Sequence, residues 1–178
     1  MRKLALGTSP SVVVGDEKPF ASWYRCMFGV VTSPLAGVQE GDSWHMHHYG
    51  LSTQIFTCKE STLFFIYKKL EKPTRNGRRY SQEEEERFAL EVGDSHVTPL
   101  LKIRDVIDRR QWSVLTDLDE GIVEHFHGAG RIALVGDAII KQAPNLDQGW
   151  NSGVQDVVVL TIKLRELVVR KLEGGGIG

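Results

Sequence analysis

Residues able to contact an anionic ligand gather in the last third of the chain. They combine carboxylates, amides, glycines and a proline: Gly136, Asp137, Pro144, Asp147, Gln148, Gly149 and Asn151. The apolar run 131–135 that precedes them is typical of a buried strand, and a long helical pattern over 152–172 follows them. A strand, a Gly-Asp turn and a helix start form a corner suited to an anion or a cofactor, because a helix N-terminus favours negative charge.

Four of the six histidines form His-x-His pairs, His45 with His47 and His125 with His127. Alternate residues of a strand share a face, so each pair could present two imidazoles to one metal ion. No carboxylate at a suitable spacing completes a known metal site. We therefore interpret these histidines as pocket or surface residues and predict no metal centre.

The segment 130–167 resembles the second flavin-contacting motif of FAD-dependent, aromatic-hydroxylase-type monooxygenases. It is most similar to the fungal paxilline-type branch, which oxidises or epoxidises isoprenoid side chains in secondary metabolism. The matching positions are Gly130, Arg131, Leu134, Gly136, Asp137, Ala138, Pro144, Asn145, Gln148, Gly149, Asn151 and Asp156. Residues 24–29 also resemble the family's entry into its substrate-side sheet, so the resemblance covers roughly residues 16–173.

The resemblance implies FAD as the cofactor and gives roles to individual positions. In the family, the residue matching Asp137 hydrogen-bonds the ribityl chain, and the segment matching 144–151 lies along the isoalloxazine. The expected cofactor-binding residues are therefore Gly136, Asp137, Pro144, Gln148, Gly149 and Asn151. The helix that follows points its N-terminus at the flavin, where it stabilises negative charge on the reduced ring.

The sequence departs from the family pattern in two respects. It contains no Gly-x-Gly-x-x-Gly between a strand and a helix, the motif that cradles the FAD pyrophosphate. From the resemblance we therefore expect about half of the enzyme to lie outside this sequence, and we expect this chain alone not to retain FAD. In the second motif, Ile140 replaces His, Asp147 replaces Gly, and Trp150 is bulky for its position.

Asp147 has two interpretations. The first is that Asp147 reflects drift after loss of the flavin or is a plain residue at the start of a helix. The second is that Asp147 is an acid in an apolar cleft. In such a cleft, loss of solvation favours the protonated carboxyl group, which can then donate a proton. The candidate proton donors of the chain are Asp147, Asp137 and His47.

Composition places the chain among ordinary globular domains. It has 178 residues, of which 41% are hydrophobic and 25% charged, with a formal net charge of -1. This balance gives no electrostatic footprint for nucleic acid or an anionic membrane, and no apolar run reaches the roughly 18 residues of a membrane span. With only two cysteines, Cys26 and Cys58, which we interpret as small core residues, we predict a reducing, cytoplasmic location.

The middle of the chain must supply the sheet. Aromatic and β-branched residues predict an antiparallel meander with strands at 22–31, 43–49, 52–58 and 62–70. Ser81, with Glu84 three residues later, predicts a capping box and a helix. A short helix over 98–110 and a strand over 111–118 follow.

The predicted fold class is therefore α+β. An antiparallel sheet of about four to six strands precedes a C-terminal strand-turn-long helix unit. The domain spans 22–173, after an irregular lead-in at 1–21 and before a flexible tail at 174–178. We expect the long helix to pack its Val/Leu/Ile face on the core.

Three functions remain open. The first is a truncated FAD-dependent monooxygenase of fungal secondary metabolism, acting on an isoprenoid-bearing small molecule only if another chain supplies the flavin half. The second is a flavin-free enzyme that opens, cyclises or rearranges an epoxide in the old substrate pocket. The third is an inactive remnant or a binding protein. The expected partners are an apolar small molecule and either a second copy or a complementing flavin-binding chain, because a missing half-domain exposes apolar surface.

Overall fold

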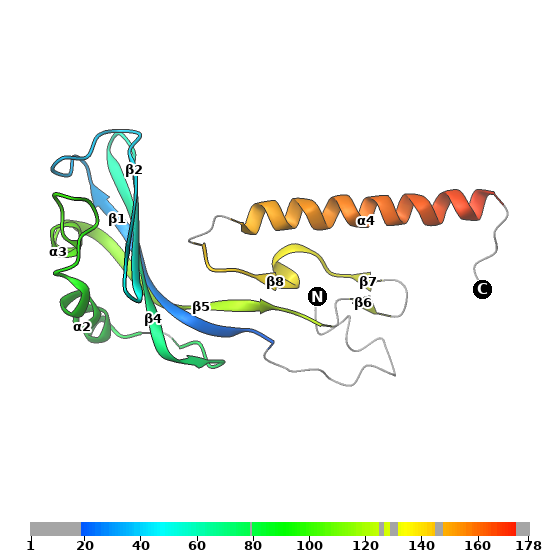
Figure 1. Cartoon of the computed structure of the whole chain (residues 1–178), viewed down its shortest axis with the longest axis horizontal. Helices are drawn as coiled ribbons and strands as arrows, with labels where there is room; N and C mark the ends of the chain where they lie inside the picture. Colours follow the sequence, from blue (N-terminus) through cyan, green and yellow to red (C-terminus); the bar gives the residue numbers. More distant parts are fainter. Residues whose placement is uncertain (1–18, 79, 125–126, 129–131, 145–147, 174–178) are drawn as a thin grey trace. The chain divides into compact units, whose positions relative to one another are not determined.

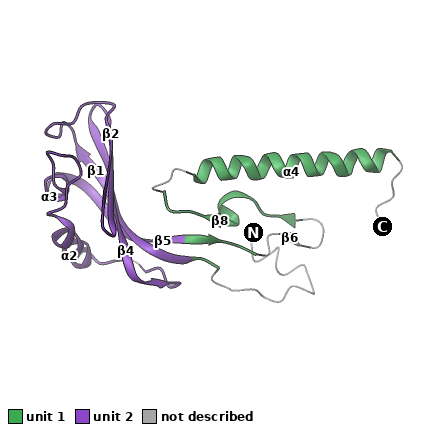
Figure 2. Ribbon diagram, viewed as in Figure 1, with its two compact units in different colours: residues 1–20, 120–178 green, residues 21–119 purple. Residues whose placement is uncertain are grey.

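The computed structural model describes residues 19–78, 80–124, 127–128, 132–144 and 148–173 (Figure 1). The chain divides into two compact units, one of residues 21–119 and one of residues 1–20 and 120–178 (Figure 2). Both are described separately below, and the boundaries 22–173 for a single domain stay a prediction. No helix within the described ranges has the length and hydrophobicity of a membrane span.

An antiparallel sheet forms the unit of residues 21–119, with its strands in the order β2-β3-β4-β1-β5. The strands are β1 (Ala21–Thr32), β2 (Ser43–His48), β3 (Leu51–Thr57), β4 (Ser61–Thr74) and β5 (Arg110–Ile122). Strands β2, β3 and β4 form a meander as predicted, but β1 pairs with β4 and not with β2, so the prediction of one four-strand meander is wrong at β1, because strand-forming runs do not specify which strands pair. β4 also continues four residues beyond its predicted end at 70. Successive residues of β1 and β4 point to opposite sides of the sheet, and this alternation determines which side chains lie on each face.

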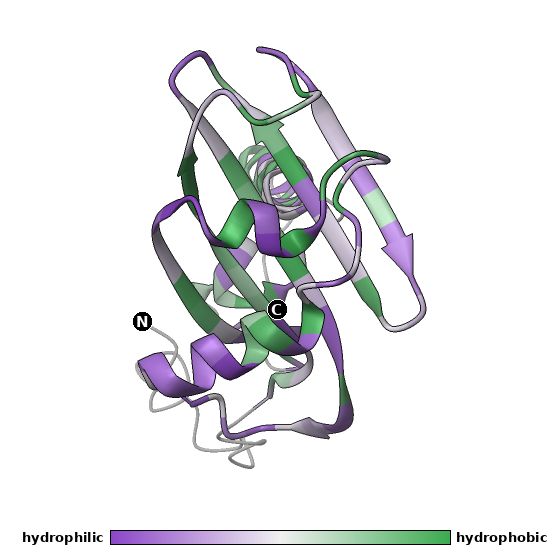
Figure 3. Cartoon of the chain, turned by 90° about the vertical axis from the view of Figure 1, so that its left-hand side faces the viewer, coloured by the Kyte–Doolittle hydropathy of each residue, from purple (hydrophilic) through white to green (hydrophobic). Residues whose placement is uncertain are grey.

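Two helices cover one face of this sheet, α2 (Gln82–Val92) and α3 (Ile103–Ile107). Figure 3 shows them in front of the strands, with hydrophilic residues at the beginning of α2. The core between them joins strand residues to helix residues: Met27, Val31, Ile55, Phe64, Ile66, Phe88, Val92, Ile103, Val106 and Ile107. Burying each such large side chain contributes about 1.5–3 kcal/mol relative to leaving it exposed.

The predicted capping box of α2 is confirmed. The backbone N–H of Glu84 donates to Ser81 Oγ at 3.3 Å, and the backbone N–H of Ser81 donates to Glu84 Oε2 at 3.0 Å. The hydrogen bond from the Ser81 backbone lowers the pKa of the Glu84 carboxyl below its usual value. The charged carboxylate is therefore the form that caps the helix.

We expect Glu84→Gln to destabilise the protein in a pH-dependent manner. A lowered pKa in the folded state means that Glu84 stabilises the fold above its unfolded pKa of about 4.5, and that this contribution disappears as the pH falls through the folded value. Glutamine keeps an acceptor oxygen and removes only the charge. Urea unfolding should show a gap between wild type and variant at about pH 7 that closes near pH 3. Glu83→Gln, in the same first turn but outside the box, is the control. A gap of constant size would contradict the assignment.

The second unit is built from several short elements and one long helix. The last residues of β5, Gly121 and Ile122, pair with β8 (Ile140–Lys141), and β6 (His127–Gly128) pairs with β7 (Ile132–Ala133). A single 3-10 turn, η1 (Gly136–Ala138), precedes the long helix α4 (Gly149–Leu172). A small core joins Val123, Leu134 and Ile139. Among the described residues of the predicted strand, 132–135, only β7 is paired, while Leu134 is buried as expected.

The strand-turn-long helix unit is confirmed, but one expectation about the helix is wrong. α4 begins three residues before the predicted start and ends at 172 as predicted, yet none of its residues is buried. Its Val/Leu/Ile face does not pack on the core of the described structure. A periodic apolar stripe indicates that a helix face is suited to being covered, but it does not specify what covers it.

The cysteines differ in their environments. Cys26 is only 1% exposed, and burial raises the pKa of its thiol to about 12. Cys58 lies just after β3 and is exposed, so its interpretation as a core residue is wrong. Strand β3 ends at Thr57, one residue earlier than predicted, so Cys58 lies in the turn before β4.

Candidate functional site

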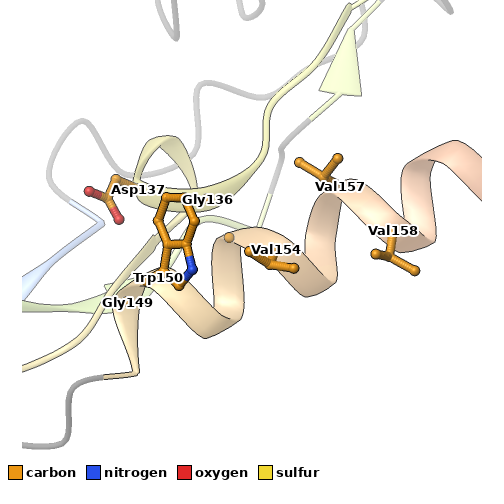
Figure 4. A pocket seen from close by; sticks show the side chains of 8 residues that line it. Gly136, Asp137, Gly149, Trp150, Val154, Val157 and Val158 are labelled. Atoms are coloured by element: carbon orange, nitrogen blue, oxygen red, sulfur yellow. The ribbon is translucent and has the colours of Figure 1, made fainter.

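An open cavity of about 540 Å³ lies where η1 meets the first turns of α4 (Figure 4). Its lining is formed by Gly136, Asp137, Gly149, Trp150, Gly153, Val154, Val157 and Val158. Three of the predicted cofactor-binding residues are therefore brought together, namely Gly136, Asp137 and Gly149. The structure adds an apolar wall of valines, which suits a flat, largely apolar ring.

The corner is held by a hydrogen bond between the turn and the helix. The backbone N–H of Gly136 donates to Asp156 Oδ2 at 2.8 Å. Gly136 has φ +59°, a left-handed conformation that glycine adopts without strain. A Cβ built on Gly136 would lie 3.7 Å from the Cα of Gly153, so two glycines face each other where η1 approaches α4. Asp156 matches the flavin-contacting motif, and its role here is to anchor the turn.

Asp137, by contrast, is available to a ligand. Its side chain is exposed, and the structure gives it no hydrogen-bond or ion-pair partner among the described residues. Figure 4 shows Asp137 and Trp150 at the end of the cavity where α4 begins, with Val157 and Val158 further along the helix. A carboxylate in this position can accept hydrogen bonds from hydroxyl groups of a ligand.

The N-terminus of α4 also faces this region. Its N-cap residue, Gln148, makes no side-chain cap hydrogen bond, and the first turn contains no acidic residue. The first backbone N–H groups of a helix have no partner within the helix. They can therefore donate to a ligand's oxygen atoms, and the helix dipole favours negative charge there. Basic residues Arg170 and Lys171 occupy the last turn, as the dipole prefers.

The remaining predicted site residues have different positions. Pro144, Gln148 and Asn151 are exposed, and none of the three lines this cavity. Asp147 lies outside the described residues. His47 is exposed on β2, in the other unit. Of the three candidate proton donors, only Asp137 is thus shown at the cavity.

The histidine pairs form no metal cluster within the described part of the chain. His45 and His47 share a face of β2, as predicted, but both ring nitrogens of His45 already have protein partners. His127 is exposed on β6, and His125 is outside the described residues. No group of three or more potential metal ligands occurs among the described side chains.

Sequence reasoning missed Gly153 and the valine wall. Gly153 follows Gly149 by four residues, and residues four apart lie on the same helix face. That spacing could have identified Gly153 as the point of close approach to η1. Val154 and Val158 were interpreted only as part of a core-facing stripe, and Val157 was not included.

Comparison with known proteins supports the resemblance. A family model described as FAD binding domain matches residues 32–171. FAD-dependent monooxygenase esdpE of Penicillium shearii is 31% identical over 153 residues, which cover 84% of this chain and 31% of the relative. FAD-dependent monooxygenase nvfK of Aspergillus novofumigatus is 31% identical, with 93% and 36% covered. FAD-dependent monooxygenase andE of Emericella variicolor is also 31% identical, with 99% and 37% covered.

This chain therefore spans about a third of the length of these relatives. A solved structure with a similar fold is the tetracycline destructase Tet(51). The TM-score is 0.50 at 15% identity, and the similarity covers 79% of this chain and 38% of that protein. The fold class predicted from the sequence is confirmed by this likeness.

Proposed function

Because this chain belongs to the FAD-binding-domain family, to which it is similar over residues 32–171, we propose that it forms the flavin-ring side of a FAD-dependent monooxygenase. The corner between η1 and α4 contacts FAD, and a separate segment or chain with a Gly-rich nucleotide-binding turn holds the adenylate end. The observation that carries this proposal is the cavity at the start of α4, where the Asp137 carboxylate has no partner among the described residues.

The residues at the cavity fit a flavin. Gly149 has no heavy atom within 4 Å of a built Cβ, so a ligand can approach its backbone closely. Asp137 accepts hydrogen bonds from ribityl hydroxyls, and Val154 and Val157 exclude water from one side of the ring. The backbone N–H groups at the start of α4 favour negative charge on the ring. FAD itself, when bound, supplies the redox chemistry.

The exposure of α4 supports a complementing partner. Most of its large apolar side chains are between 41% and 82% exposed: Trp150, Val154, Val157, Val158, Val159, Ile162, Leu164, Leu167, Val168, Val169 and Leu172. Exposed apolar surface of this extent marks an interaction site. A chain that carries the nucleotide-binding half covers this helix in our proposal, and a second copy of this chain is the alternative occupant.

The proposed substrate is an apolar, isoprenoid-bearing small molecule. This part of the proposal rests on the motif's resemblance to the paxilline-type branch. A second candidate function is flavin-free acid catalysis on an epoxide. It rests on the Asp137 carboxyl group, which lines the same cavity as Val154, Val157 and Val158. Under that alternative, colourless protein converts an isoprenoid epoxide, and Asp137→Asn abolishes the conversion.

The test of the flavin proposal uses Asp137→Ala. The chain is co-expressed with the part of the Emericella relative that lies outside the match, and FAD is titrated while flavin fluorescence is followed. We expect Asp137→Ala to weaken FAD binding by about tenfold, since a charged acceptor is lost. Glu173→Ala, which removes the same charge at the far end of α4, should leave the affinity unchanged. Equal affinities for wild type and Asp137→Ala would contradict the assigned role.

A further inference from the structure

Strand β2 is an outer edge of the sheet in the unit of residues 21–119. β3 pairs with one side of β2, in an antiparallel register that runs from Ser43 opposite Phe56 to His48 opposite Leu51. Within the described residues, no strand pairs with the other side of β2. We call this other side the free edge. An edge strand presents a row of backbone N–H and C=O groups that can pair with a further strand.

The hairpin between β2 and β3 fixes the hydrogen-bonding pattern of both strands. Only Tyr49 and Gly50 separate the strands, and Gly50 has φ +67°. The residues that flank such a two-residue turn, His48 and Leu51, are paired in the register. In hairpins of this length, the flanking residues exchange both of their backbone hydrogen bonds. The alternation along β2 is therefore counted from His48.

Two sets of residues follow from this count. Hydrogen-bonded and non-hydrogen-bonded pairs alternate along an antiparallel ladder, so Met46 and Trp44 bond to β3 as His48 does. The residues between them direct their backbone N–H and C=O groups to the free edge: Ser43, His45 and His47. The free edge thus offers three residues with the spacing that a further antiparallel strand requires.

β2 has none of the features that usually prevent edge strands from pairing. Natural edges are often protected by lysine, by proline, by charged side chains or by a bulge. The sequence of β2, SWHMHH, contains no Lys, Arg, Asp, Glu or Pro. Its register with β3 is continuous over all six pairs, so β2 has no bulge. A strand without formal charge also gives no basis for selecting a partner of opposite charge.

We propose that β2 pairs antiparallel with β2 of a second copy of this chain, with His45 on the two-fold axis. Each His45 then exchanges two backbone hydrogen bonds with its counterpart, and Ser43 lies opposite the partner's His47. In this register every residue from 43 to 47 has a counterpart, and the turn at 49–50 stays outside the paired region. The interface is isologous, as in most homodimers.

The side chains on the helix side of β2 are suited to this register. Trp44 lies opposite the partner's Met46, and the same contact occurs twice by symmetry. Both side chains are only partly buried in the single chain, and Trp44 packs against the core. Thioether sulfur and aromatic rings make favourable contacts. Pairing therefore covers apolar surface that the single chain leaves in water.

The first test measures self-association of the full chain by sedimentation equilibrium. His45→Pro removes the N–H that bonds across the two-fold axis, and proline is tolerated on an edge strand where the N–H faces solvent. We expect this variant to weaken the dimer at least about tenfold, since two symmetric hydrogen bonds are lost. His45→Ala is the matched control, because it removes the ring and keeps the N–H. Its dimer should be as stable as that of the wild type.

The second test uses the wild type alone, so it does not depend on a variant that folds. Hydrogen exchange is measured at low and at high protein concentration. The amides of His45 and His47 should become protected only at high concentration, whereas those of Trp44 and Met46 should be protected at both. Protection that does not change with concentration would contradict the pairing.

A third variant distinguishes the free edge from the exposed helix α4. Leu167→Lys introduces a charge into the apolar surface of α4, where Leu167 is 51% exposed, and should leave the edge dimer intact. A wild type that stays monomeric, or association that survives His45→Pro unchanged, would overturn the proposal. The free edge uses no residue of the η1–α4 corner, so these results are independent of the flavin proposal.

Discussion

Gly29→Ala is expected to destabilise the unit of residues 21–119 strongly. Gly29 lies in β1, where a Cβ would be 2.3 Å from the backbone oxygen of Trp112 and 2.9 Å from the ring of Phe64. Neither neighbour can move, because the first belongs to the adjacent strand β5 and the second is fully buried. Overpacking costs typically about 1–3 kcal/mol, and a backbone clash this close belongs at the upper end, a large share of the roughly 5–15 kcal/mol of a typical domain.

Denaturant unfolding followed by tryptophan fluorescence measures this effect. Gly77→Ala is the matched control, since the nearest atom to its built Cβ is a side-chain oxygen at 3.8 Å. The control should unfold at nearly the wild-type midpoint. If Gly29→Ala unfolded there as well, the close approach of β1 and β5 would be wrong.

Asp156→Ala is expected to release the turn η1 from α4. The Gly136 N–H loses a charged acceptor at 2.8 Å, an interaction that contributes about 1.5–3 kcal/mol. Hydrogen exchange of the Gly136 amide should therefore accelerate by about ten- to a hundredfold. Asp156→Asn keeps an acceptor oxygen and should exchange at an intermediate rate.

The matched control for this prediction is Glu166→Ala, which removes a carboxylate from the exposed surface of the same helix. Its effect on the Gly136 amide should be negligible. Unchanged exchange in Asp156→Ala would show that the hydrogen bond to Gly136 does not hold the corner.

The strands and the first helix could be predicted because their signals are local. The capping box requires only Ser81 and Glu84 at a fixed spacing, and each strand requires only a run of aromatic and β-branched residues. The pairing of β1 with β4 is not local, and it was not predicted. The Gly136–Asp137 turn was found in the same way, through a motif within one short segment. The two-residue strands β6, β7 and β8 are too short to show a period, so only a buried run around β7 was predicted.

The other features depend on contacts that the sequence pattern does not specify. The prediction that the apolar face of α4 packs on the core was wrong, because an apolar stripe does not identify the surface that covers it. The hydrogen bond from the Tyr67 hydroxyl to Gln54 Oε1 at 2.9 Å was missed, because the two residues are on different strands, β4 and β3. Strand parity placed His45 and His47 on one face, but the register that brings Gln54 opposite His45 is a property of the folded sheet.

The central claim is that this chain contacts the flavin ring but holds FAD only together with a nucleotide-binding half. The direct measurement is flavin absorbance that co-elutes with the protein on gel filtration after incubation with FAD. The account predicts a colourless peak for the chain alone. It predicts a yellow peak, with one FAD per complex, when the remaining segment of the Emericella relative is present. A yellow peak for the lone chain, or a colourless complex, would contradict it.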